Sequence, residues 1–187
     1  HGVVIRTTSD RMLVIPGQTI TVPFVVTNTG NVREKFKIIP NSMGTQDVVV
    51  FHDSNRDGLR QATEPVINEI SLAPKEEAGI AIEIKTSKAA LDGSEENLLL
   101  TVSSEEEPAK LASGATKLFY SRPVLQLAMT GRDGRLKPGE VGSFDLTISN
   151  RGSNLAKIVE LQSTWPEQLD LVAADPASSA VSNGNIT

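Results

Sequence analysis

Apolar and polar residues alternate along most of this chain, and this two-residue period restricts the fold more than any other feature. In residues 78–86, AGIAIEIKT, the side chains of Ile80, Ile82 and Ile84 fall on one face of an extended strand. Sequences rich in Gly, Pro, Asn and Asp interrupt such runs every 8 to 15 residues and mark turns. Short alternating strands at this spacing predict an all-β fold of the antiparallel sandwich type.

Three further segments have the same period. Their apolar positions are Ile20, Val22, Phe24 and Val26 in the first, Leu98, Leu100 and Val102 in the second, and Leu125, Leu127 and Met129 in the third. Long helical periods are absent, and SKAALDG at residues 87–93 is one helical turn at most. We therefore expect strands in each of these segments.

The chain also repeats itself. Residues 16–31, PGQTITVPFVVTNTGN, align without gaps on residues 138–153, PGEVGSFDLTISNRGS. Both segments enter a strand through Pro-Gly and leave it through Asn-x-Gly, which are turn sequences. The repeat predicts two copies of one domain, residues 1–120 and residues 121–187. The alternative is two similar hairpins inside one large domain.

The second copy is short. It holds about four strand candidates, against seven or eight in the first copy. Half a sandwich would leave its core face and a strand edge uncovered in water, which is unfavourable. We therefore expect either that the sequence is a fragment or that another molecule supplies the missing strands, as in a homodimer formed through the unpaired strands.

One acidic loop has the spacing of a metal site. Residues 53–64, DSNRDGLRQATE, meet every fixed position of the calcium-loop pattern D-x-[DN]-x-[DN]-G-x5-E. In such a loop the oxygen atoms converge on one hard divalent cation, because the glycine permits a sharp bend and the final glutamate closes the shell. The predicted calcium ligands are Asp53, Asn55, Asp57, the carbonyl of Leu59, Gln61 through a water molecule, and Glu64. The alternative is a polar turn without a metal.

The surroundings of this loop limit the kind of calcium site. Arg56 and Arg60 partly cancel the negative charge of the three carboxylates. Strand-like sequences flank the loop, so it is not half of a helical sensor pair. We expect an affinity near the extracellular range, roughly 10⁻⁴ to 10⁻³ M, at which calcium is bound outside cells.

The order of these segments resembles a known family. PGQTITVPFVVTNTGN, then FHDSNRDGLRQATEP, then LAPKEEAGIAIEI is similar to the tandem immunoglobulin-like repeats of large bacterial cell-surface proteins, often classified as domains of unknown function, and to bacterial cell-adhesion-related domains. LKPGEVGSFDLTISNRGSNLAKIVEL and WPEQLDLVAAD of the second copy resemble the common core of the same family. The resemblance implies two tandem immunoglobulin-like sandwiches, the second incomplete, in a secreted or cell-surface protein. It also implies the acidic loop and no catalytic residue.

Composition excludes several function classes. The net charge is −5 and basic residues are not clustered, which argues against nucleic-acid binding. No apolar run approaches the 18 residues of a membrane span, and no signal peptide is visible. The absence of cysteine excludes disulfides and thiolate chemistry.

The remaining candidate residues favour structural roles. His1 and His52 are the only histidines, so a histidine-based triad or zinc site is not expected. The acidic run Ser103–Lys110 is expected to be a solvated loop. Trp165 is expected in a core or at a domain junction, with a ligand contact as the alternative.

Two functional hypotheses follow from these observations. The first is a non-catalytic structural or adhesive module, whose partners are other surface proteins or neighbouring repeats. The alternative is a carbohydrate-binding accessory domain of a surface enzyme, in which Trp165 would contact the sugar. We do not expect the chain to be an enzyme, because its acidic clusters lie in turns and aromatic residues make up only 4% of the sequence.

Overall fold

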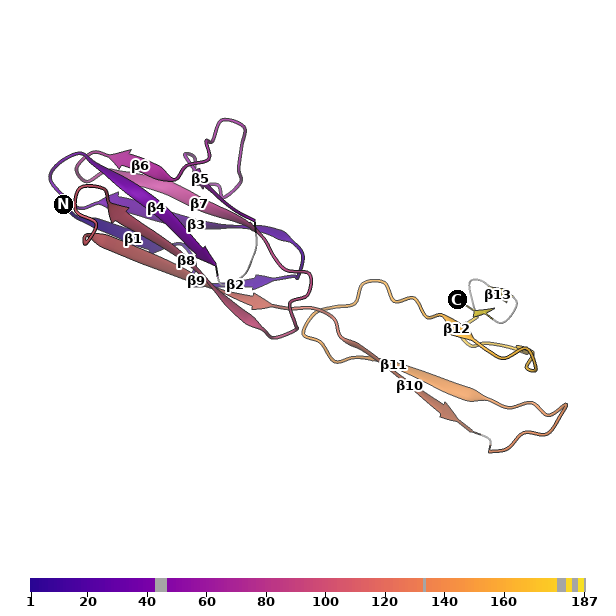
Figure 1. Ribbon diagram of the computed structural model, residues 1–187. Coiled ribbons are helices and arrows are strands. Elements are labelled where there is room, and N and C mark those ends of the chain that lie inside the picture. Colours follow the sequence, from indigo (N-terminus) through magenta and orange to yellow (C-terminus); the bar gives the residue numbers. More distant parts are fainter. Residues whose placement is uncertain (43–46, 133, 178–180, 183–184, 187) are drawn as a thin grey trace. The chain divides into compact units, whose positions relative to one another are not determined.

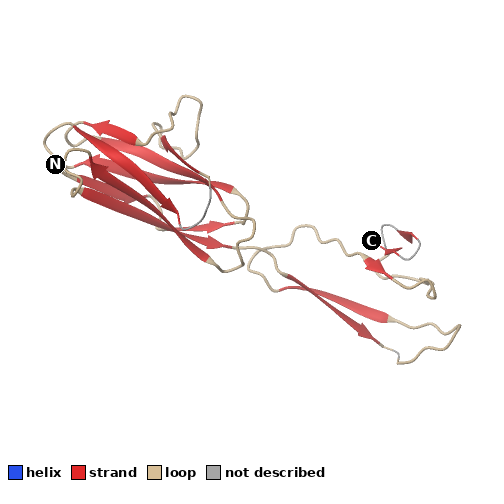
Figure 2. Ribbon diagram, viewed as in Figure 1, coloured by secondary structure: helices blue, strands red, loops and turns tan. Residues whose placement is uncertain are grey.

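The computed structural model describes residues 1–42, 47–132, 134–177, 181–182 and 185–186. Strands joined by turns make up this part of the chain, and it contains no helix, so none that could cross a membrane (Figure 2). The predicted all-β class is therefore confirmed. The chain divides into two compact units, His1–Asn154 and Leu155–Thr187.

Nine strands of the first unit form a two-layered sandwich (Figure 1). They are β1 (Val3–Thr7), β2 (Arg11–Val14), β3 (Thr19–Asn28), β4 (Glu34–Ser42), β5 (Val48–His52), β6 (Glu69–Leu72), β7 (Glu77–Lys85), β8 (Glu95–Ser104) and β9 (Leu111–Tyr120). One sheet has the order β1-β3-β7-β5 and the other has the order β2-β9-β8-β4-β6. All neighbours are antiparallel except β2 and β9, which run parallel.

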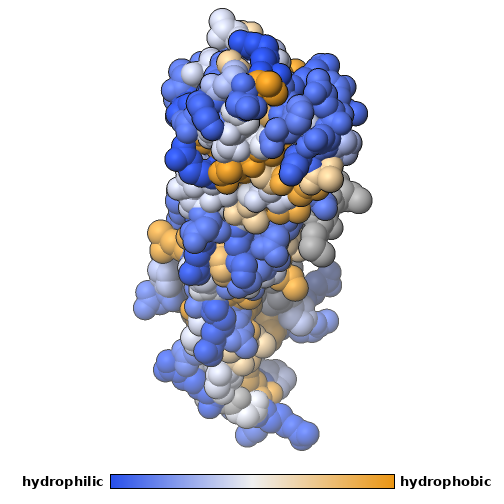
Figure 3. Space-filling view, turned by 90° about the vertical axis from the view of Figure 1, so that its left-hand side faces the viewer, coloured by the Kyte–Doolittle hydropathy of each residue, from blue (hydrophilic) through white to orange (hydrophobic). Residues whose placement is uncertain are grey.

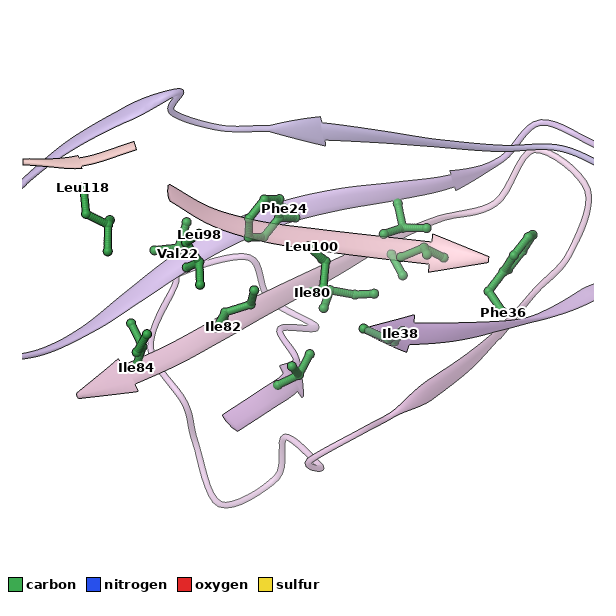
Figure 4. Packing of buried hydrophobic residues seen from close by; sticks show 14 of the residues in the cluster. Val22, Phe24, Phe36, Ile38, Ile80, Ile82, Ile84, Leu98, Leu100 and Leu118 are labelled. Carbon is green, nitrogen blue, oxygen red and sulfur yellow. The ribbon is translucent and has the colours of Figure 1, made fainter. Parts of the chain in front are cut away.

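The core lies between the two sheets and includes the predicted inward residues of β3, β7 and β8. Phe24 of β3, Ile80 and Ile82 of β7, and Leu98 and Leu100 of β8 are at most 1% exposed (Figure 4). Full burial of such a side chain stabilises a fold by about 1.5–3 kcal/mol. The alternation in the sequence thus identified the face that packs.

The outer face of β5 and β7 is covered as well. Phe51 of β5 is paired with Ala81 of β7, so both side chains point away from the core, yet both are fully buried. The loop that follows β5 crosses this face, because Asp53 and Arg56 lie directly against Gly79 of β7. The two-residue period places Ala81 on the face opposite Ile80 and Ile82, and the loop accounts for its burial there.

The second copy begins with a hairpin of β10 (Leu125–Gly131) and β11 (Phe144–Asn150) that repeats the pairing of β1 with β3. Val3 pairs with Asn28 in the first copy, and Leu125 pairs with Asn150 in the second. The turns repeat too. The Asn28 Oδ1 atom accepts from the Gly30 N–H at 2.9 Å, as Asn150 Oδ1 accepts from the Gly152 N–H at 3.0 Å.

The hairpin belongs to the first unit, so the boundary predicted between residues 120 and 121 lies inside that unit. Hydrogen bonds explain this. Asp92, in the turn between β7 and β8, accepts from the Ser153 N–H at 2.9 Å and from the Arg122 N–H at 2.8 Å. These bonds tie the turn after β11 and the segment before β10 to the sandwich.

Among its described residues, the second unit contains three two-residue strands in the order β12-β14-β13. They are β12 (Ser163–Thr164), β13 (Val181–Ser182) and β14 (Asn185–Ile186). Residues 156–162 correspond by the repeat to part of β4 but are not a strand. In the first copy β4 lies between β8 and β6.

Candidate metal centre

The predicted calcium loop leaves the sheet at the end of β5 and returns along the same strand. The His52 N–H donates to the Pro65 carbonyl at 3.0 Å, and the Ile67 N–H donates to the Val50 carbonyl at 2.9 Å. Phe51 and Val66 form a bridge between these two bonds. Residues 53–64 are therefore held at both ends by one short antiparallel ladder.

Asp53, the first predicted ligand, carries a buried carboxylate. The residue is 1% exposed, and its Oδ2 atom accepts from the Gly58 N–H across the loop at 3.0 Å. This bond turns the carboxylate toward the interior of the loop. The other oxygen, Oδ1, is buried and has no hydrogen-bond partner in the structure as described. An unpaired oxygen of a buried carboxylate is costly, so a missing partner at this position is informative.

Glu64, the last predicted ligand, closes the loop. It is 4% exposed, and its two oxygens accept from different backbone amides: Oε1 from Ser54 at 3.0 Å and Oε2 from Gln61 at 3.1 Å. The carboxylate thus joins the beginning of the loop to its end. It is already partly satisfied by N–H donors, unlike Asp53 Oδ1.

Asn55, Asp57 and Gln61 form a hydrogen-bonded cluster on the exposed side of the loop. The Asn55 amide donates to Asp57 Oδ2 at 2.9 Å and to Gln61 Oε1 at 3.1 Å. The Gln61 amide also donates to Asp57 Oδ2, at 2.5 Å. The structure therefore brings together three of the predicted ligand side chains, in a loop whose ends are fixed by two others.

Asp57 also accepts a hydrogen bond from the Leu59 N–H at 2.8 Å. This bond, with smaller contributions from Asn55 and Gln61, holds the pKa of the Asp57 carboxyl below its ordinary value of 3.8. Asp57 is consequently ionised at neutral pH. Leu59 contributes to the hydrogen bonding of the loop through its backbone N–H. Its side chain is 66% exposed.

The bend of the loop uses two residues in the left-handed region of the backbone map. Arg56 has φ of 60° and Gly58 has φ of 73°. A Cβ atom on Gly58 would meet nothing within 4 Å, so glycine is favoured there by its conformation and not by lack of space. This agrees with the predicted role of Gly58 in the sharp turn.

The two arginines of the loop are directed toward β7. Arg56 pairs with Glu77 at 3.7 Å, and Arg60 pairs with Glu83 at 3.6 Å. The sequence suggested that these arginines would offset the charge of Asp53, Asp57 and Glu64. In the fold they are matched by glutamates outside the loop, which sequence spacing could not reveal.

In the part of the chain that the structure describes, no three His, Cys, Asp or Glu side chains lie close enough together to form a metal site by themselves. The three predicted carboxylates, Asp53, Asp57 and Glu64, therefore do not meet as a group of this kind, and the predicted set depends also on two side-chain amides and a backbone carbonyl. The chemistry of its donors, all of them oxygen, fits a hard cation such as calcium.

The other candidate residues lie apart from the loop. The His52 side chain is half-buried at the end of β5, and His1 Nδ1 lies 3.0 Å from the buried carboxylate of Glu34. Ser104, from the acidic run, donates to the same glutamate. Trp165 is half-buried within the second unit. None of these contacts involves residues 53–64.

Comparisons with known proteins give no family. No protein-family model and no curated protein matches the chain. Among solved structures, the chain is similar to native Escherichia coli alpha-2-macroglobulin (17% identity, TM-score 0.47, 74% of this chain and 8% of that one). It is also similar to the elastase-activated form of that protein (14%, 0.45, 74% and 11%) and to a family 123 glycoside hydrolase from Clostridium perfringens (11%, 0.39, 64% and 27%).

The chain spans only about a tenth of the length of the alpha-2-macroglobulin structures. Likenesses at these identities and TM-scores give no argument for function. The description of the first copy as an immunoglobulin-like sandwich therefore follows from its own two sheets and strand order.

Proposed function

We propose that this chain is a non-catalytic structural or adhesive module of a secreted or cell-surface bacterial protein, in which loop 53–64 holds a calcium ion. The observation that supports it most is the Asp53 carboxylate, which is 1% exposed and has one oxygen without a partner. A divalent cation inside the loop would supply that partner.

The residues that would hold the ion are those of the predicted set. Asp53, Asn55, Asp57 and Glu64 would contribute side-chain oxygens, Leu59 its carbonyl, and Gln61 a bound water. Three carboxylates give the loop a formal charge of −3 before the arginines are counted, and Glu77 and Glu83 match those arginines. Bound calcium would neutralise most of this charge.

The role of the ion would be mechanical. The loop covers Phe51 and Ala81 on the outer face of the sheet, and its base covers the outer edge of β5. An ion that joins Asp53 to Glu64 would hold the loop over the outer face of the sheet and the base of the loop along the edge of β5. An affinity of roughly 10⁻⁴ to 10⁻³ M would make this effective outside cells, where calcium is abundant.

A module of this kind would act by binding other molecules at its surface or by packing against adjacent domains of the same chain. The proposed partners are other surface proteins or adjacent repeats. His1 and His52 lie in different parts of the sandwich. The face in Figure 3 is mostly hydrophilic, with small hydrophobic patches.

Thermal unfolding in calcium and in EDTA tests this proposal. We expect millimolar calcium to raise the melting temperature by several degrees over EDTA, because a ligand that binds only the folded state stabilises it. Asp57→Ala should remove that difference, whereas Asp170→Ala, which removes an acidic residue from the second unit, should preserve it. A wild-type curve that is the same in calcium and in EDTA would contradict the proposal.

A further inference from the structure

Loop 53–64 lies on one particular strip of the sandwich, the outward-facing residues of β7. In chain order these are Glu77, Gly79, Ala81 and Glu83, and we refer to them as the β7 seat. The two glutamates at its ends pair with Arg56 and Arg60 of the loop. The two small residues between them lie beneath the loop and are buried.

Gly79 is the point of closest approach. A Cβ atom placed there would lie 2.3 Å from the Asp53 carbonyl oxygen and 2.9 Å from Arg56 Cγ. The arginine side chain can move aside, but the carbonyl oxygen is backbone. Asp53 is also the residue whose carboxylate is buried in the loop. Any side chain at position 79 would therefore displace the first predicted ligand.

The backbone conformation of β7 does not require a glycine at position 79. Its φ is not among the positive values found at Gly17, Gly58, Gly93 and Gly139. Glycine in the interior of a strand is unfavourable, and it often marks a place where another backbone comes close. Here that backbone belongs to Asp53.

The strand is also less able to yield than the loop. Gly79 is paired with Val25 of β3, and the adjacent Ile80 is paired with both Phe24 and His52. β7 lies between β3 and β5 in the middle of its sheet. A clash at position 79 would therefore move the loop and not the strand.

We infer that Gly79 is a positioning residue of the calcium site: it binds no ion, but it allows the loop to hold the shape in which Asp53 faces the ion. This inference rests on the proposed function and extends it to a strand outside the loop. Residues that orient metal ligands typically change metal affinity by about 10- to 100-fold when replaced.

The direct test is calcium titration calorimetry on Gly79→Ala. We expect its calcium affinity to fall at least about tenfold relative to the wild type. The matched control is Gly114→Ala in β9, where a Cβ atom would lie 2.7 Å from Ile5 Cγ2 in the opposite sheet. That variant should lose stability and keep its calcium affinity within about twofold, because no loop residue is near.

A second pair of variants covers the case in which Gly79→Ala does not fold. Residues 53–64 are replaced by a short Gly-Ser linker that joins His52 to Pro65. With the loop removed, Gly79→Ala should change the melting temperature by no more than a few degrees. In the full-length loop the same substitution should cost clearly more, because the Asp53 carbonyl is present.

The outcomes separate the two ideas. Wild type that binds no calcium would overturn the proposed function and with it the metal role of Gly79. Wild type that binds calcium while Gly79→Ala binds equally well would overturn the inference alone. An equal cost of Gly79→Ala with and without the loop would also overturn it, since the clash would then lie elsewhere.

Discussion

At the scale of single residues, Asp57 shows how the backbone of the loop prepares a carboxylate for a cation. Its oxygens accept from the Leu59 N–H, from the Asn55 amide and from the Gln61 amide. These donors favour the ionised form, which lowers the pKa of Asp57 from its ordinary 3.8. The loop therefore stabilises negative charge at this position before any metal is bound.

This pKa shift predicts a pH-dependent contribution to stability without calcium. Because the folded pKa is depressed, the contribution is present above the unfolded value near 3.8 and is lost as pH falls through the lower folded value. We expect urea midpoints of the wild type to exceed those of Asp57→Asn slightly between pH 5 and 7. The difference should shrink as pH falls below about 3.8 and through the lower folded value. A difference that is constant from pH 3 to pH 7 would contradict this assignment.

At the scale of secondary-structure elements, the loop and its return segment protect an edge strand. β5 is at the edge of its sheet, and exposed edges invite pairing with other chains. Residues 65–67 cover that edge through the bonds of His52 and Ile67. The segment that covers this edge therefore follows directly after the candidate metal site, so a bound ion would help to keep the edge covered.

We expect calcium to slow hydrogen exchange at this edge. Removal of calcium with EDTA should speed the exchange of the His52 and Ile67 amides on the order of tenfold, because local opening no longer has to release the ion. The Ile82 amide, in the middle of the same sheet, serves as the internal control and should change little. Equal acceleration at all three amides would indicate global destabilisation. It would contradict the prediction that calcium stabilises this edge locally.

At the scale of the whole molecule, the hairpin of the second copy presents an apolar face. Residues paired across strands share a face, so the following side chains lie together: Leu125, Leu127, Met129, Phe144, Leu146 and Ile148. Each is between 40% and 69% exposed. The equivalent residues of β3, namely Val22, Phe24 and Val26, are at most 1% exposed because a second sheet covers them.

This face supports the prediction that the chain associates through the second copy. We expect light scattering after size-exclusion chromatography to show dimer at tens of micromolar protein. Leu146→Asp should restore the monomer, because it places a charge within the apolar face. Thr147→Asp, which adds the same charge on the opposite face of β11, should leave the dimer intact. A wild type that is monomeric at all concentrations would contradict the prediction.

Much of the fold could be predicted because its signals are local. The alternation of Ile80, Ile82 and Ile84 identified a strand and its buried face, and all three are at most 1% exposed. The repeat of residues 16–31 at 138–153 corresponds to the same strand pairing in both copies, because the same turns and apolar positions select the same register. The loop spacing likewise selected Asp53 and Glu64, the two residues that the fold buries there.

The sequence by itself therefore determined which segments form strands, which face of each strand is buried, and which residues the loop contains. Each of these depends on residues that are close together in the chain. Only the tertiary structure decided which strand the loop lies on, why position 79 is glycine, and that Glu77 and Glu83 pair with the arginines of the loop. The physical reason is that these contacts join segments distant in sequence, and their positions are fixed only when the sheets have assembled around the core.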